Sequence, residues 1–215
     1  AAAEACFSVQ AIMDNIELRL GGLCRLDKGG ASYDALREFL TEDFTPAFHE
    51  IKRWCTASLH QSAMALDSEL APEERTLSPS DFGFHNAARR GDGQICFLDF
   101  EYFGWDDPAK MVSDFLLHPA MELTRNLKRR FMAGIVGHLA NHEHLARRVE
   151  VVYPLFGLKW CLILLNEFIP EGLSRRRFAR EEAVDEAGLQ AEQLDKSRRL
   201  LRQLRAEYEC FPYRP

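Results

Sequence analysis

The sequence predicts a mainly α-helical fold with one small β-hairpin. Apolar residues recur at helical spacing along most of the 215 residues, which is the pattern of amphipathic helices. The strand-like runs are short: Ala87–Arg90 and Gln94–Phe100 flank the turn signal Arg-Gly-Asp-Gly. With 47% apolar and 28% charged residues, the chain is long enough to form one well-buried core.

Three helices are expected before the hairpin, at Phe7–Leu20, Tyr33–Leu40 and Ala47–Met64. Residues 43–46 are expected to interrupt the second helix, because Thr45 can cap a new helix and Pro46 can occupy its first position. The third helix should present an apolar face to the core, formed by Phe48, Ile51, Trp54, Cys55 and Leu59. A polar linker, residues 67–76, then leads to the hairpin.

Four helices are expected after the hairpin. Asp107 followed by Pro108 is again a cap and proline signal. It predicts that the first of these helices begins here. The four expected helices are Ala109–Leu117, Leu123–Ala140, Glu143–Phe168 and Leu189–Tyr208. Pro154 is expected to kink the third of them. The phenylalanines at and after the hairpin are expected to be core residues: Phe97, Phe100, Phe103 and Phe115.

The candidate site lies between Leu77 and Pro108. Asp81 and Asn86 occur in a loop of poor helix formers, so both side chains can project from an irregular backbone. Pairing of the hairpin strands would bring Asp99 back beside Asn86. One carboxylate to orient a hydroxyl, with an amide and a second carboxylate to hold Mg²⁺, is the chemistry of phosphoryl transfer.

This pattern also resembles known families. The spacing D-x-x-x-x-N before an apolar strand ending in Leu-Asp-Phe-Glu is similar to the catalytic loop and metal-binding Asp of protein kinases. The segments 81–86 and 97–108 are more similar to the aminoglycoside phosphotransferase and choline kinase family of small-molecule kinases. The resemblance implies that Asp81 is the catalytic base and that Asn86 and Asp99 bind Mg²⁺, with ATP as co-substrate. Asp107, at the start of the next helix, becomes a candidate substrate ligand, although a helix cap is the favoured role.

The sequence departs from that family in two ways. Pro79 stands where the family usually has a loop-supporting His, and it can stiffen the loop instead. The family also carries a lobe of strands with a glycine-containing phosphate loop and an ATP-pairing Lys before the catalytic loop. The eighty residues before Asp81 contain no G-x-G-x-x-G and no run of alternating strands. The chain is therefore expected to represent the C-terminal helical lobe of such a kinase, with the N-terminal β-lobe absent.

The resemblance implies one domain over residues 1–215. Residues 1–76 would be leading helices and linker, 77–108 the catalytic loop and metal-binding hairpin, and 109–215 a helical substrate-side part. The expected reaction moves the γ-phosphoryl of ATP to a hydroxyl of a small molecule, either a cationic compound or a sugar. Two alternatives remain: a catalytically silent binding or scaffold module, and a domain that cooperates with a β-lobe on another chain.

Composition restricts the expected partners and compartment. A net charge of −6 argues against a nucleic-acid partner. The most apolar window, residues 149–169, contains Glu150, Lys159 and Glu167, which favours a core helix over a membrane span. The first ten residues lack the features of an export signal. Six cysteines without a C-x-x-C pair are expected to be reduced thiols. We therefore expect a cytoplasmic protein.

Two other clusters have weaker interpretations. His138, His142 and His144 could hold a transition metal if their helix continues, but no Glu completes the His-Glu-x-x-His zinc pattern. Basic residues gather on the last predicted helix: Arg198, Arg199, Arg202 and Arg205. A solvated face is the favoured interpretation of this group, and a docking site for an anionic substrate or partner is the alternative.

Overall fold

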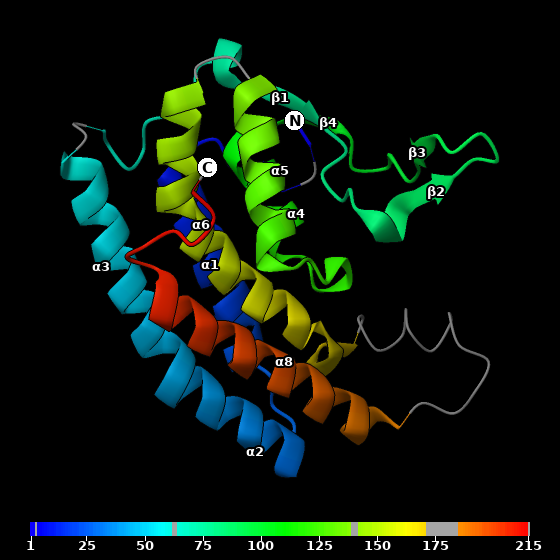
Figure 1. Ribbon diagram of the computed structural model, residues 1–215. Helices are drawn as coiled ribbons and strands as arrows, with labels where there is room; N and C mark the ends of the chain where they lie inside the picture. Colours follow the sequence, from blue (N-terminus) through cyan, green and yellow to red (C-terminus); the bar gives the residue numbers. More distant parts are fainter. Residues whose placement is uncertain (3, 62–63, 139–141, 171–184, 215) are drawn as a thin grey trace.

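The computed structural model describes residues 1–214 apart from 3, 62–63, 139–141 and 171–184, and describes only the backbone of 142 and 143. These residues form a helical body with two two-stranded sheets at one side (Figure 1). The helices are α1 Val9–Cys24, α2 Ala31–Glu38, α3 Thr45–Gln61, α4 Pro108–Leu117, α5 Arg125–His138, α6 His142–Leu164 and α8 Glu186–Glu207. The strands are β1 Thr76–Ser78, β2 Ala87–Arg89, β3 Ile95–Phe97 and β4 Gly104–Asp106. The prediction of a mainly helical fold is confirmed.

Helix α6 is the centre of the core. It packs against α1, α3, α4, α5 and α8, which surround it in Figure 1. Its fully buried side chains include Val152, Leu155, Phe156 and Leu158. By length and composition, residues His144–Phe168 could cross a membrane, but 72% of the apolar window is buried inside the protein. A helix that is apolar on all sides is typical of a protein core.

The predicted interruption before Thr45 is wrong. Helix α2 continues through a π-helical turn, η1 Phe39–Phe44, directly into α3. Pro46 has no N–H for the regular i→i−4 pattern, and the wider turn lies immediately before it. The Leu40 carbonyl oxygen accepts hydrogen bonds from both the backbone N–H and the hydroxyl of Thr45, the hydroxyl at 2.7 Å. Thr45 therefore closes the wide turn and does not cap a new helix.

The apolar face of α3 is largely as predicted. Phe48, Ile51, Cys55 and Leu59 are buried. Trp54 is only half-buried, and the edge of its ring contacts Tyr208 at a centroid distance of 5.7 Å. Its position lies at the border of the apolar stripe, where the helix meets the end of α8.

The predicted hairpin is present, and a second sheet accompanies it. Strands β2 and β3 pair antiparallel with Ala87 opposite Phe97, and Gly93 provides the left-handed turn position with φ 86°. Strands β1 and β4 also pair antiparallel, with Thr76 opposite Asp106. The second pairing joins the two ends of the candidate-site segment and fixes where α4 begins. Figure 1 shows β2 and β3 projecting from the helical body.

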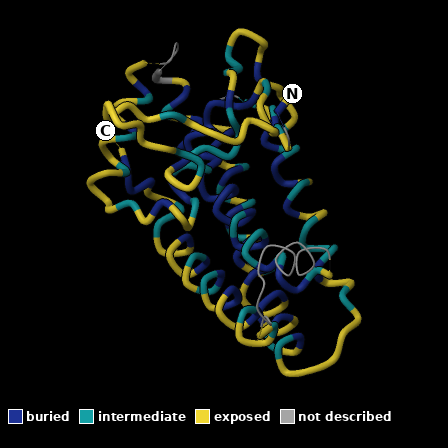
Figure 2. The backbone as a smooth tube through the Cα atoms, turned by 90° about the vertical axis from the view of Figure 1, so that its right-hand side faces the viewer, coloured by how far each residue is buried: buried dark blue, intermediate teal, exposed yellow. Residues whose placement is uncertain are grey.

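The two sheets and the segments that connect them contain many large apolar residues that are exposed; exposed residues are yellow along the backbone in Figure 2. We call this set the hairpin surface; its members are 40–61% exposed and comprise Leu77, Phe84, Ile95, Phe97, Leu98, Phe100, Tyr102, Phe103 and Trp105. The prediction that Phe97, Phe100 and Phe103 are core residues is therefore wrong for this structure. Apolar patches of this kind usually mark an interaction surface.

Candidate functional site

The loop between β1 and β2 holds Asp81 in a tight turn. The Asp81 N–H donates to the Pro79 carbonyl oxygen at 2.9 Å, around Ser80 in a left-handed conformation with φ 67°. Asn86 closes the loop, because its Nδ2 donates to the Asp81 backbone oxygen at 2.8 Å. Gly83 allows close packing, since a Cβ there would lie 2.8 Å from His85 Cε1. The Asp81 side chain remains 44% exposed and accessible to a ligand.

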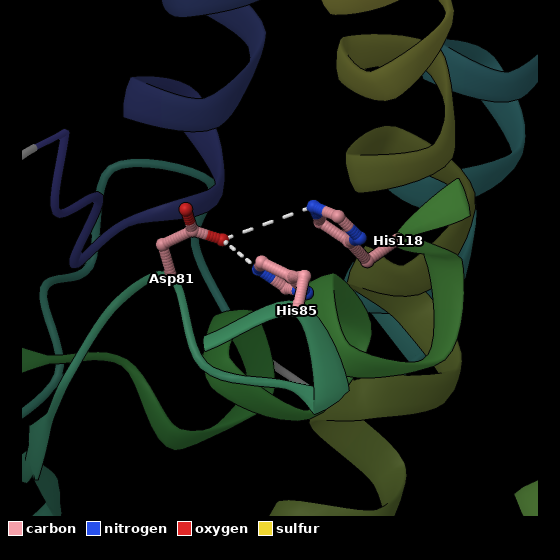
Figure 3. A group of neighbouring side chains, drawn as sticks. All are labelled: Asp81, His85 and His118. Atoms are coloured by element: carbon pink, nitrogen blue, oxygen red, sulfur yellow. Dashed lines mark hydrogen bonds and ion pairs between the residues drawn. The ribbon is translucent and has the colours of Figure 1, made fainter. Parts of the chain in front are cut away.

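Two stacked histidine rings lie on one side of the Asp81 carboxylate, next to the same oxygen (Figure 3). Asp81 Oδ1 lies 3.0 Å from His85 Nε2 and 3.8 Å from His118 Nε2. The imidazole rings stack with centroids 4.0 Å apart and planes 6° from parallel. His85 belongs to the same loop as Asp81, whereas His118 immediately follows α4, and no sequence signal links it to Asp81. The cap signal predicts where α4 begins, but the packing of that helix is what brings its end to Asp81.

The hydrogen bonds of His118 define its tautomer. The Ala120 backbone N–H donates to His118 Nδ1 at 3.1 Å, so a neutral ring carries its proton on Nε2, which faces Asp81. Burial and the nearby His85 lower the pKa of His118, and they outweigh the opposing effect of Asp81 and Asp114. His118 is therefore neutral at pH 7 and presents an N–H to the carboxylate.

This trio does not fit a transition metal well. Asp81, His85 and His118 offer three ligand atoms within 4.8 Å of one another, as a metal centre requires. A metal on His118 Nε2 would force the ring proton onto Nδ1, where the Ala120 N–H already points. The geometry instead suits a carboxylate held by neighbouring imidazoles, with open space on its other side.

The predicted Mg²⁺ ligands lie near each other along the backbone. The Leu98 N–H donates to the Asn86 backbone oxygen at 2.8 Å, which places Asp99 next to this pairing. Asp99 is exposed and left-handed, with φ 60°. That conformation costs a non-glycine residue about 1 kcal/mol or more and is common at functional sites. Joint binding of Mg²⁺ by Asn86 and Asp99 stays a prediction.

Asp107 is a helix cap, and its role as a substrate ligand is not supported by its position. Its Oδ1 accepts from the Ala109 N–H at 2.8 Å at the start of α4. Its Oδ2 pairs with Arg148 on α6, 2.7 Å from Nη2. The side chain is completely buried. Both oxygens are engaged inside the core, so a substrate has no access to them.

A pocket of about 410 Å³ opens beside Asp81. Among its lining residues are Glu4, Asp81, Tyr102, Asp114, Lys159 and Trp160. We call it the Asp81 pocket. The Asp114 carboxylate anchors its wall, because it accepts from Trp160 Nε1 at 2.9 Å and lies 3.2 Å from Lys110 Nζ.

The two lysines of the Asp81 pocket are neutralised by carboxylates. Lys110 Nζ lies 2.8 Å from Asp106 Oδ2, besides its contact with Asp114. Burial lowers the pKa of Lys110, but the carboxylates of Asp114 and Asp106 outweigh burial and raise it overall. Lys159 Nζ lies 2.7 Å from Glu4 Oε2. Because Glu4, Asp81 and Asp114 outnumber the two lysines among the lining residues, the pocket is net acidic.

The alternative histidine cluster is not assembled among the described side chains. His138 Nδ1 lies 2.7 Å from the Gly134 carbonyl oxygen, and His144 Nδ1 pairs with Glu74 at 3.0 Å. The side chain of His142 lies outside the described residues, so a site that uses it stays untested.

The comparisons with known proteins find likenesses among solved structures. No family model matches the chain, and no curated protein matches it. The fold is similar to that of an ethanolamine kinase from Plasmodium vivax, with a TM-score of 0.49 and 14% sequence identity. The match covers 91% of this chain and 50% of that kinase chain. The chain thus spans about half the length of that solved protein.

His118 should make stability depend on pH. Its pKa is lowered in the folded protein relative to about 6.5 in the unfolded chain. Between these values the unfolded chain binds more protons, so the free energy of unfolding should fall as the pH drops through this window. His118→Gln should reduce that fall when urea denaturation at pH 7.5 is compared with that at pH 5.5. An identical pH dependence in parent and His118→Gln would contradict the assignment.

Proposed function

We propose that the chain is the catalytic, helical lobe of an ATP- and Mg²⁺-dependent phosphotransferase acting on a hydroxyl of a small molecule. The observation that carries the proposal is the placement of Asp81: a half-exposed carboxylate beside a net acidic pocket of about 410 Å³. Asn86 holds the same loop and Asp99 follows the strand paired with it. A base, two candidate oxygen ligands and an acceptor pocket are the components that phosphoryl transfer needs.

The chain's own residues would act on the acceptor. His85 Nε2 lies within hydrogen-bond distance of Asp81 Oδ1, at 3.0 Å, which would fix the carboxylate while its remaining lone pairs orient the acceptor hydroxyl and accept its proton. The pocket walls would position that hydroxyl and exclude water. Asn86 and Asp99 would hold Mg²⁺, which when bound offsets the negative charge of the phosphates.

The charge of the pocket favours a cationic acceptor over an anionic one. Its lysines pair with Asp106, Asp114 and Glu4, whereas Asp81 forms no ion pair with a lysine among the described residues. The aromatic side chains of Trp160 and Tyr102 also line the pocket, and aromatic faces attract organic cations. An aminoalcohol or amino sugar therefore fits this pocket better than a neutral sugar or an acid.

The hairpin surface supplies the docking face for a nucleotide-binding β-lobe. Its apolar side chains lie on both sides of Asp99 in the sequence and extend to β1, immediately before the Asp81 loop. Two-stranded sheets are marginally stable alone and gain from cover by further strands. A lobe seated there would bring the phosphates of ATP toward Asn86 and Asp99. The same exposed surface supports the second candidate, a silent module that binds a protein partner through it.

Mg²⁺-linked stabilisation tests the metal assignment. With Mg²⁺ and a non-hydrolysable ATP analogue at ten times the dissociation constant, stability should rise by about 1.4 kcal/mol, or about 3–6 °C in Tm. Asp99→Asn should remove this shift without changing the Tm in EDTA. Asp92→Asn, in the turn of the same hairpin, is the matched control. If the parent is stabilised and Asp99→Asn is stabilised equally, Asp99 is not a ligand.

A further inference from the structure

A second pocket adjoins the Asp81 pocket and shares two of its wall residues. It has a volume of about 270 Å³ and lies between α5, α6, α8 and the turn that follows α4. His118 and Trp160 line both pockets, and their rings meet edge to face at a centroid distance of 4.8 Å. We call this second cavity the α8 pocket.

The α8 pocket has the opposite charge to the Asp81 pocket. Lys128 from α5 and Lys196 and Arg199 from α8 line it, against a single acidic lining residue, Glu122. Lys196 is paired with Glu192 at 2.7 Å. In the part of the chain that the structure describes, Lys128 and Arg199 form no ion pair. The Lys128 ammonium instead lies 5.2 Å from the centre of the Tyr213 ring.

The remaining lining is mostly apolar, with side chains that include Leu117, Tyr153, Leu164, Leu200 and Leu204. An apolar floor with a few convergent polar groups is the usual form of a small-molecule site. Burial lowers the pKa of Lys128 more than Glu207 raises it, so a bound anion would restore a favourable environment for its charged form.

We propose that the α8 pocket binds a small organic anion, a phosphate monoester or a carboxylate with an apolar body. The apolar body would lie on the leucine floor, and the anionic head would lie between Lys128 and Arg199. His118 and Trp160 form the wall that the two pockets share, so a ligand in the α8 pocket should affect the surroundings of Asp81. His118 lies beside the Asp81 carboxylate, and Trp160 donates a hydrogen bond to Asp114. An anion in the pocket should raise the pKa of His118, since a nearby negative charge favours the imidazolium form.

The arginine groove beside this pocket provides an internal control. Arg198, Arg202 and Arg205 line a neighbouring groove of about 410 Å³ with Phe39 and Asp43, and Arg199 borders both this groove and the α8 pocket. That groove contains its own carboxylates, and Arg205 also pairs with Glu50 at 3.4 Å. Arg202 is on the same helix as Arg199 and carries the same charge, but it does not line the α8 pocket.

Tryptophan fluorescence can locate the ligand. The chain has three tryptophans, so Trp54→Phe with Trp105→Phe leaves Trp160 as the sole reporter in the shared wall. Phenyl phosphate and benzoate are titrated as the two anion classes, and neutral benzyl alcohol is the control ligand. We expect saturable binding of at least one anion. Lys128→Ala with Arg199→Ala should weaken it about tenfold or more, because a charge-assisted hydrogen bond is among the strongest contacts a site provides, while Arg202→Ala should change it less than twofold.

Three further variants make the outcome decisive. Lys128→Ala and Arg199→Ala are also measured singly, with circular dichroism as the check of folding. Tyr102→Ala alters the Asp81 pocket but not the α8 pocket, and it should leave affinity unchanged. Unaltered affinity in the double variant, absence of saturable binding by either anion, or loss of binding in Tyr102→Ala would each overturn the proposal. None of these measurements requires phosphotransferase activity, so the two proposals stand or fall separately.

Discussion

Asp81→Asn is expected to lower phosphoryl transfer by about 10²–10⁴-fold, the usual contribution of a general base, while nucleotide affinity changes little. The asparagine amide fills the same space and can still accept a hydrogen bond from the His85 ring, 3.0 Å from Asp81 Oδ1 in the parent. It cannot take the proton of an acceptor hydroxyl. A fall in kcat without a large change in KM for ATP is the signature of an interaction made in the transition state.

The measurement needs the nucleotide-binding part. A fusion of these residues with a β-lobe, about 100 residues by ordinary domain size, is assayed with ATP and a panel of aminoalcohols and amino sugars. The 215 residues alone are expected to show little or no turnover, because positioning of the phosphates supplies most of the catalysis. Substantial Asp81-dependent turnover by the 215 residues alone would refute the need for that lobe. Turnover by the fusion that ignores Asp81 would refute the kinase proposal.

The sequence predicted the parts of the site whose residues lie close together in the chain. Asp81 and Asn86 share one short loop, and the Arg-Gly-Asp-Gly turn sets the pairing that brings Asp99 near Asn86. The β1–β4 pairing was missed because each strand is three residues long and its partner is distant in the sequence. A period-two pattern needs a longer run to be recognised.

His118 and the hairpin phenylalanines show the limit of such reasoning. His118 reaches Asp81 through the packing of α4, which no spacing in the sequence encodes. Phe97, Phe100 and Phe103 were expected in the core because they are aromatic, yet their side chains are about half exposed. Composition identifies apolar residues but not what covers them. The mainly helical body was predictable since its signal is repeated over several turns of each helix.

Arg148→Met should destabilise the protein by about 3–5 kcal/mol, the usual result of removing one partner from a buried ion pair. Asp107 is fully buried, and Arg148 Nε and Nη2 lie 2.9 Å and 2.7 Å from its Oδ2. Arg148 Nη2 also donates to the Phe7 carbonyl oxygen at 3.3 Å. One guanidinium therefore ties α6 to the start of α4 and to the segment before α1. The methionine has a similar length but leaves the carboxylate charge without compensation in the core.

Urea denaturation at pH 7 measures this effect, and the neighbouring residue provides the control. Arg147 is 45% exposed and lies 3.8 Å from Glu150, so Arg147→Met should change stability by about 0.5 kcal/mol or less. Asp107→Asn combined with Arg148→Met should recover part of the loss, because the asparagine can still cap α4 and carries no charge to bury. Equal small effects of Arg148→Met and Arg147→Met would mean that the pair contributes little. An additive loss in the double variant would mean that the two side chains act independently, and α4 would then be positioned by its apolar face alone.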